Sequence, residues 1–139
     1  MTDEPDLLPP RVLIVEDAAA ERALLRELLE AEGVSVVAEA GDGAEGVVGA
    51  LQFQPEVVLM DLRMPGMGGI EATRLIKASL PTTQVIILTV YEGPLPERSA
   101  EEVGAYAYLV KGCSPQLVRD VIFQARNYKT GLDTTAGES

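Results

Sequence analysis

Five polar residues stand at the ends of short apolar runs in this sequence. They are the adjacent pair Glu16 and Asp17, followed by Asp61, Thr89 and Lys111. Three carboxylates held together repel one another, so a cation between them would be needed to keep all three ionised. The chain has no histidine and one cysteine, and hard oxygen ligands favour Mg²⁺ or Mn²⁺ over zinc.

Asp61 has the chemistry of a nucleophile in this set, because a carboxylate beside a cation can attack a phosphoryl group and form an acyl phosphate. The cation and an ammonium group would neutralise the oxygens of the group in transfer, and Lys111 is the candidate ammonium. Thr89 supplies a hydroxyl that can donate a hydrogen bond to the bound phosphoryl group. The residue types therefore predict phosphoryl transfer to Asp61.

Parallel strands would bring these distant residues together. The apolar runs predict five strands, at Val12–Val15, Val34–Ala38, Val57–Met60, Val85–Leu88 and Tyr106–Val110. Strands that alternate with helices predict an α/β fold with a five-stranded parallel sheet and helices on both faces. Sites in such folds lie beyond the carboxyl ends of the strands, which is where all five polar residues fall.

Helical patterns occupy the intervening segments. We expect Asp17 to cap the first helix and Gly33 to end it, with one core face formed by Leu24, Leu25, Leu28 and Leu29. The second helix is expected at 42–53, and the third is spaced by Ile70, Thr73, Ile76 and Leu80 and closed by Pro81. Gly93, Pro94 and Pro96 predict a loop and a helix that starts only at about Pro96 and runs to Val103. Ser114 and Pro115 predict the start of the last helix, whose core face is Leu117, Val118, Val121, Ile122 and Ala125.

Composition narrows the class of protein. The 139 residues suit one domain, and the net charge of -11 with no basic cluster argues against nucleic-acid contact by this chain. The apolar runs are too short to span a membrane, and the acidic first ten residues do not resemble a secretion signal. We expect a cytoplasmic protein in which the lone Cys113 is an inert residue at a helix start.

Four stretches of the sequence resemble the CheY-like receiver family of two-component response regulators. They are VLIVED (12–17), VVLMDLRMPGMGG (57–69), IILT (86–89) and GAYAYLVK (104–111). The resemblance covers residues 11–127, and leaves an N-terminal extension at 1–10 and a tail at 128–139. It implies the flavodoxin-like strand order 2-1-3-4-5.

The resemblance also implies individual roles. Asp61 would be the phosphorylated residue, Asp17 a direct metal ligand, and Glu16 a ligand through water. The main-chain carbonyl of Arg63 would complete the protein ligands of Mg²⁺. Three further roles follow: the switch residues are Thr89 and Tyr108, the phosphate-binding residue is Lys111, and the residue that shapes the following loop is Pro65. Such a domain is a phospho-acceptor that promotes its own magnesium-dependent phosphorylation and dephosphorylation, rather than an enzyme.

The family implies a histidine kinase or phosphotransfer protein as partner, and a homodimer formed on phosphorylation. The run from Leu62 to Met67, with Gly112, resembles receivers that precede a LuxR-type helix-turn-helix. Transcriptional control would follow if an effector domain exists in the full-length protein. Tyr106, placed on the same strand face as Tyr108, is either a packing residue or an interface anchor.

Three other classes of protein fit these residues less well. A haloacid-dehalogenase-type phosphatase would need a second Asp where Arg63 stands. A flavodoxin would need a loop rich in Ser, Thr and Gly in place of the acidic pair, and a pseudo-receiver would need a broken site.

The sequence also leads to two expectations about the dynamics of the domain. Arg63 and Tyr91 would shield the phosphoryl group from water, and the segment from Tyr91 to Val103 would be the most mobile internal segment and the one that phosphorylation orders.

Overall fold

The computed structural model describes residues 8–90 and 93–128. Its strands are β1 (Arg11–Val15), β2 (Ser35–Ala40), β3 (Val57–Met60), β4 (Gln84–Thr89) and β5 (Ala107–Val110). Its helices are α2 (Ala19–Ala31), α3 (Gly43–Phe53), α4 (Gly69–Ser79), α5 (Pro94–Glu102) and α6 (Pro115–Asn127). Strands and helices alternate along the described chain, as the apolar runs predict.

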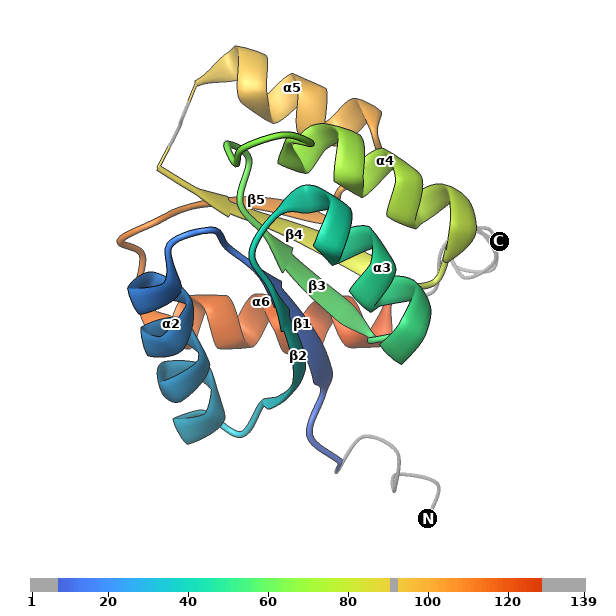
Figure 1. The fold of residues 1–139 in the computed structure, drawn as a ribbon. Helices are drawn as coiled ribbons and strands as arrows, with labels where there is room; N and C mark the ends of the chain where they lie inside the picture. Colours follow the sequence, from blue (N-terminus) through green and yellow to red (C-terminus); the bar gives the residue numbers. More distant parts are fainter. Residues whose placement is uncertain (1–7, 91–92, 129–139) are drawn as a thin grey trace, which may run out of the picture.

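The strands form one parallel sheet in the order β2-β1-β3-β4-β5. This confirms the flavodoxin-like 2-1-3-4-5 order. Helices α2 and α6 cover one face of the sheet, and α3, α4 and α5 cover the other (Figure 1). Within residues 8–90 and 93–128, no helix has both the length and the apolar character that a membrane span requires.

The central strands bury side chains on both faces. Neighbouring residues of β1 alternate between the two cores: Val12 and Ile14 pack toward α2 and α6, while Leu13 and Val15 pack toward α3 and α4. β3 and β4 alternate in the same way. Period-two alternation in a sheet covered on both sides explains why these strands are continuous apolar runs.

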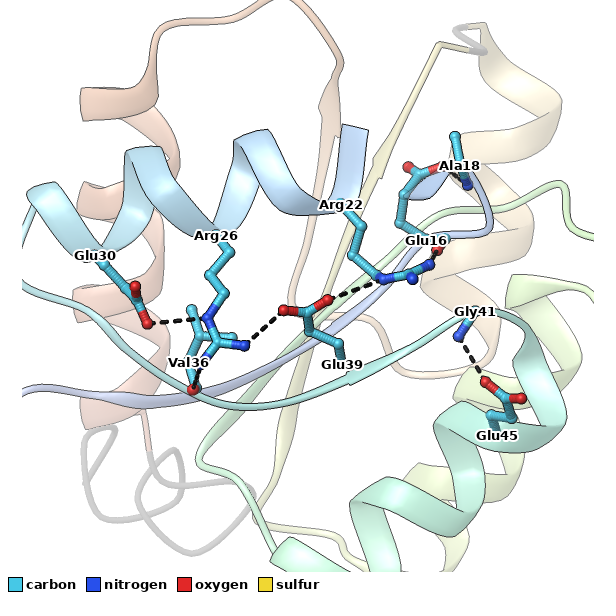
Figure 2. A network of polar contacts seen from close by, with 9 residues as sticks. All are labelled: Glu16, Ala18, Arg22, Arg26, Glu30, Val36, Glu39, Gly41 and Glu45. Atoms are coloured by element: carbon cyan, nitrogen blue, oxygen red, sulfur yellow. Dashed lines mark hydrogen bonds and ion pairs between the residues drawn. The ribbon is translucent and has the colours of Figure 1, made fainter. Parts of the chain in front are cut away.

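An irregularity in β2 changes which of its side chains face α2. Val12 of β1 pairs with Val36, but Leu13 pairs with Ala38, so Val37 is an extra residue in the ladder. Val36 and Ala38 consequently face opposite cores, although a regular strand would place them on one face. Glu39, the next residue, thereby lies on the α2 side of the sheet (Figure 2).

The helix ends follow the expected turn chemistry at three places. Asp42 caps α3 by accepting a hydrogen bond from Glu45 N at 2.8 Å, and Ser114 caps α6 by accepting from Leu117 N at 3.1 Å. Gly33 has φ +89° just beyond α2, and Val34 N donates to Leu29 O at 3.1 Å. This is the Schellman arrangement that favours glycine.

Three expectations about the helices were wrong: one about the start of α2 and two about core faces. α2 begins after Ala18 rather than being capped by Asp17. Of its four leucines only Leu29 is buried, while Leu24 is 55% and Leu28 38% exposed. In α6, Leu117 is also 43% exposed, although Val118 on the next position is buried. Apolar spacing identified helices here but did not distinguish a buried face from a solvent-facing one.

Helix α5 starts two residues earlier than predicted, at Pro94. Prolines fit the first turn of a helix because the N–H groups there have no intrahelical partner, so Pro94 and Pro96 do not delay it. β5 starts at Ala107, so Tyr106 precedes the regular strand. Tyr106 packs toward the α6 side and Tyr108 toward the α4 side, which corrects the expectation of a shared face.

Candidate functional site

The carboxyl end of β1 carries the acidic pair. Glu16 is buried, and its N–H donates to the carbonyl of Ala40 at the end of β2 at 3.0 Å. Its Oε2 accepts from Ala18 N at 3.1 Å, which folds the side chain back toward the start of α2. Asp17 beside it is exposed. The pair therefore contributes one anchored carboxylate and one accessible carboxylate.

Asp61 follows β3, the neighbour of β1 in the sheet. Its N–H donates to Val15 O at 3.1 Å, so the β1–β3 ladder continues up to this residue. Its Oδ1 accepts from Leu62 N at 2.7 Å. The side chain is largely buried, and the remaining oxygen, Oδ2, faces Lys111.

The three carboxylates meet as the parallel sheet predicts. Glu16, Asp17 and Asp61 each offer an oxygen, and these atoms lie within 4.8 Å of one another. Burial raises the pKa of Glu16 above its ordinary value, so the charged form is costly unless a cation joins it. An all-oxygen donor set of this charge fits Mg²⁺ or Mn²⁺ and does not suit zinc.

Lys111 supplies an ammonium group that contacts two of these carboxylates. Its Nζ lies 2.5 Å from Glu16 Oε1 and 3.0 Å from Asp61 Oδ2. Burial by itself would lower the pKa of Lys111, but the hydrogen bonds to carboxylates outweigh it and raise this pKa above the ordinary value. The lysine therefore stays charged at neutral pH and supplies a positive group next to Asp61.

Thr89 and Tyr108 lie on the neighbouring strands β4 and β5. Thr89 is fully buried at the end of β4, and its carbonyl accepts from Lys111 N at 2.7 Å. Tyr108 is half-buried and lines a cavity of 330 Å³ between α5 and β5, together with residues such as Glu97 and Ala100. Thr89 is therefore bonded to Lys111 through its main chain, and Tyr108 lies next to α5.

The loop from Leu62 to Gly68 forms the outer wall of the site. Arg63 is exposed and lines a 490 Å³ cavity that also contains Asp17 and Pro65. Gly69 closes the loop, since its N–H donates to Leu62 O at 2.8 Å. A Cβ on Gly69 would lie 2.0 Å from Asp61 O, so only glycine permits this close approach.

Two residues of α2 belong to the site although sequence reasoning missed them. Glu21 Oε1 lies 3.0 Å from Lys111 Nζ, and Arg22 Nη1 donates to the carbonyl of Glu16 at 2.6 Å (Figure 2). The signal that could have found them is their position in the first turn of the helix that follows the acidic pair.

Comparison with known protein families shows which family has this sequence pattern. The family model described as "Response regulator receiver domain" matches residues 12–123, which is most of the chain. The chain belongs to the response regulator receiver domain family. This confirms the resemblance to CheY-like receivers of two-component signalling.

Curated relatives of this receiver domain are longer proteins. Response regulator UvrY of Escherichia coli K12 is 44% identical over 113 residues, which is 80% of this chain and 51% of UvrY. Transcriptional regulatory protein PdtaR of Mycobacterium tuberculosis H37Rv is 43% identical over 122 residues, 87% of this chain and 57% of PdtaR. The chain therefore spans about half the length of the curated relatives it matches.

Solved structures agree with this family. The signal receiver domain of NarL from Mycobacterium tuberculosis has a TM-score of 0.82 at 27% identity, covering 88% of this chain and 99% of that one. A LuxR-family response regulator from Aurantimonas sp. SI85-9A1 has a TM-score of 0.79 at 34% identity, covering 91% and 94%. The neighbours of LuxR type fit the resemblance carried by Leu62–Met67 and Gly112.

Proposed function

We propose that this receiver domain accepts a phosphoryl group on Asp61 from a histidine kinase or phosphotransfer protein. The observation that carries the proposal is the convergence of Glu16, Asp17 and Asp61 on one oxygen cluster beside the Lys111 ammonium. Asp17, Asp61 and the carbonyl of Arg63 would hold Mg²⁺ directly, with Glu16 acting through water. When bound, Mg²⁺ supplies positive charge to the oxygens of the group in transfer.

In the reaction, an Asp61 carboxylate oxygen forms a bond to phosphorus while the bond from phosphorus to the donor's imidazole nitrogen breaks. The electron pair of that bond stays with the nitrogen, which takes up a proton from solvent. Lys111 neutralises negative charge on the transferred oxygens. Thr89 and Tyr108 are the residues that would respond to the phosphoryl group and carry its effect to α5 and β5.

Acetyl phosphate with Mg²⁺ tests the proposal without the partner kinase. Wild type should gain the mass of one phosphoryl group, and this group should be released by hydroxylamine, as expected for an acyl phosphate. Asp61→Asn should gain none, and EDTA should abolish labelling of wild type. Labelling of Asp61→Asn at the wild-type level, or labelling that persists in EDTA, would exclude the assignment.

An apolar groove next to the site supports a protein donor. It has a volume of 520 Å³, and its walls come from α2, the end of β4 and the start of α6. Leu24 and Leu28 of α2 line it, and so do Glu16 and Lys111 of the site. A histidine-bearing helix seated in this groove would have its imidazole close to Asp61, and would bury the leucines that α2 leaves exposed.

The role of this groove can be tested by comparing two phosphoryl donors, the kinase and acetyl phosphate. Leu24→Glu should slow phosphoryl transfer from the cognate kinase by at least about tenfold, the scale of losing one buried apolar contact, and should leave labelling by acetyl phosphate unchanged. Val48→Glu is a matched control, since Val48 is 60% exposed on α3, on the opposite face of the sheet. Equal transfer rates from the kinase to wild type and Leu24→Glu would place the donor elsewhere.

We further propose that residues 11–127 form the functional unit, acting in the cytoplasm as the phosphorylation-dependent input of a transcriptional regulator. The relatives named as transcriptional or LuxR-family regulators, and the lengths of the relatives, support this role. The charge of -11 supports a role without nucleic-acid contact by this part of the protein. Sedimentation with and without acetyl phosphate tests the expected homodimer, which should form only with it.

A further inference from the structure

A chain of ion pairs connects the acidic pair of the site to β2. Arg22 Nη1 donates to the main-chain carbonyl of Glu16 at 2.6 Å, and Arg22 Nε donates to Glu39 Oε1 at 3.0 Å. Glu39 Oε2 in turn accepts from Arg26 Nη1 at 2.6 Å, and Arg26 also pairs with Glu30 at 3.1 Å. Figure 2 shows the series running along α2 from Glu30 to the loop that carries Glu16.

The hydrogen bond from Arg22 to the carbonyl of Glu16 restricts the position of Asp17. The carbonyl of Glu16 belongs to the peptide group that connects Glu16 to Asp17, and this group is planar. Fixing the carbonyl therefore fixes the plane that carries the nitrogen and Cα of Asp17. The N–H of Glu16 is already bonded to Ala40 O at 3.0 Å. Both main-chain polar groups of Glu16 are thus tied to β2, one directly and one through Arg22 and Glu39.

Arginine suits this position because its guanidinium is flat and presents several donors in a fixed geometry. Nη1 of Arg22 donates to the carbonyl of Glu16, and Nε of Arg22 donates to the carboxylate of Glu39. The carboxylate of Glu39 therefore sets the orientation of the guanidinium. The pair is partly shielded, with side-chain exposures of 22% for Arg22 and 27% for Glu39. Bonding to Arg26 and Arg22 lowers the pKa of Glu39, so it stays charged at neutral pH.

We propose that Arg22 is a positioning residue for the cation site, and that Glu39 acts on the site only through Arg22. This inference rests on the proposed magnesium-dependent function. Arg22 bonds to the main-chain carbonyl of Glu16 and to the carboxylate of Glu39, and in this way it orients the peptide that leads to Asp17. Losing it leaves all three carboxylates present but lets the loop between β1 and α2 rotate, which weakens cation binding.

Magnesium affinity of the 139-residue protein, measured by calorimetry or NMR titration, is the primary test. Arg22→Gln should weaken binding by about tenfold, the lower end of what loss of a group that orients ligands costs. Arg22→Lys, which keeps one donor, should recover part of that loss. Glu39→Gln should weaken binding severalfold in the wild-type background and should add nothing in the Arg22→Gln background. Glu30→Gln removes an ion pair from the far end of the series and should stay within about twofold of wild type.

Urea unfolding without Mg²⁺ separates positioning from general stability. If Arg22 only stabilised the fold, Arg22→Gln would lower the free energy of unfolding and leave Mg²⁺ affinity unchanged, which would overturn the proposal. A further loss of Mg²⁺ affinity on adding Glu39→Gln to Arg22→Gln would overturn the role of Glu39. Absence of Mg²⁺ binding in wild type would instead refute the proposed function itself, so the two failures are distinguishable.

Discussion

Glu21 Oε1 lies 3.0 Å from Lys111 Nζ, although Glu21 belongs to the first turn of α2 and Lys111 follows β5. In the proposed phosphoryl transfer, this carboxylate would compete with the incoming phosphoryl group for the same ammonium. It is also more exposed than the other two partners of Lys111, at 61% of its side chain. Glu21 is therefore the partner that Lys111 can leave at least cost.

Glu21→Gln should accelerate labelling by acetyl phosphate, because Lys111 loses a competing anion and the negative donor meets less repulsion. The increase should be up to about fivefold, since exposed ion pairs contribute roughly 0.2–1 kcal/mol. Glu27→Gln makes the same charge change at an exposed position of the same helix and serves as control. Labelling of Glu21→Gln at or below the rate of Glu27→Gln would show that Glu21 does not compete.

Gly69→Ala should destabilise the domain by about 1–3 kcal/mol, the usual cost of forcing an extra carbon into a filled space. The reason is that the new Cβ would meet the main chain of Asp61 at 2.0 Å, and main chain cannot rotate away. Gly49→Ala on α3 is the control, because its Cβ would meet Leu13 Cδ1 at an ordinary 3.5 Å. That control should be neutral or stabilising, because alanine favours helix over glycine by about 1 kcal/mol. Urea denaturation of both variants measures the difference.

Glu39 makes stability depend on pH in a defined direction. Hydrogen bonds from Arg26 and then Arg22 lower its pKa below the ordinary 4.5. A carboxyl group whose folded pKa is depressed contributes stability above its unfolded pKa and loses it as pH falls through the folded pKa. Glu39→Gln should therefore cost about 0.5–1 kcal/mol at neutral pH, and the difference from wild type should vanish as pH falls well below 4.5. A difference that stays constant in acid would show that the ion pairs are not its source.

Arg63→Ala should shorten the lifetime of the phosphorylated form. Arg63 is exposed on the cavity that contains Asp17, where its side chain can cover the approach of water to Asp61. Arg74→Ala removes an equally charged, exposed side chain from α4 and provides the control. The decay of phosphoprotein mass measures both. Equal decay in Arg63→Ala and Arg74→Ala would exclude shielding by Arg63. Tyr91, the other residue expected to shield, lies outside the described residues.

Helix α5 should exchange amide hydrogens faster than α4 and α6 in the unphosphorylated protein. Its first turn contains two prolines, and its end bonds, Glu97 N to Gly93 O and Val103 N to Ser99 O, are long at 3.3 Å. Phosphorylation should raise protection of residues 97–103, because the proposed movement of Tyr108 would change the cavity that Glu97 also lines. Equal, strong protection with and without phosphorylation would exclude α5 as the switch. The expected mobile segment begins at Tyr91, but Tyr91 and Glu92 lie outside the described residues.

Residues at strand ends could be predicted from sequence because two local signals agree there. An apolar run of four or five residues indicates a buried strand, and the polar residue that ends it must then lie at the edge of the sheet. Glu16, Asp61 and Thr89 were placed in this way, and the structure brings the first two together with Asp17. The parallel arrangement converted a pattern along the chain into proximity in space.

The contacts of α2 could not be predicted by the same means. Leu24 and Leu28 have the spacing of a core face, but spacing does not say whether a sheet, solvent or a partner faces it. Arg22 and Glu39 are 17 positions apart, and their meeting depends on the pairing of β1 with β2. Because side chains alternate with a period of two, a shift of one residue in that pairing moves Glu39 to the other face.

The extra residue Val37 in β2 thus has a consequence for how this site could be transferred to another protein. Because Val37 is the unpaired residue, deleting it would restore regular pairing with β1 and leave Glu39 opposite Ile14 on the α2 side, so the Arg22–Glu39 pair should survive the deletion. A receiver with a regular second strand should accept both side chains if the glutamate is placed opposite the residue equivalent to Ile14, and should lose the pair if it is placed one position away. What such a graft must reproduce is the pairing position of Glu39 and not its separation in sequence from Val36, because the unpaired Val37 lengthens that separation by one without changing the face.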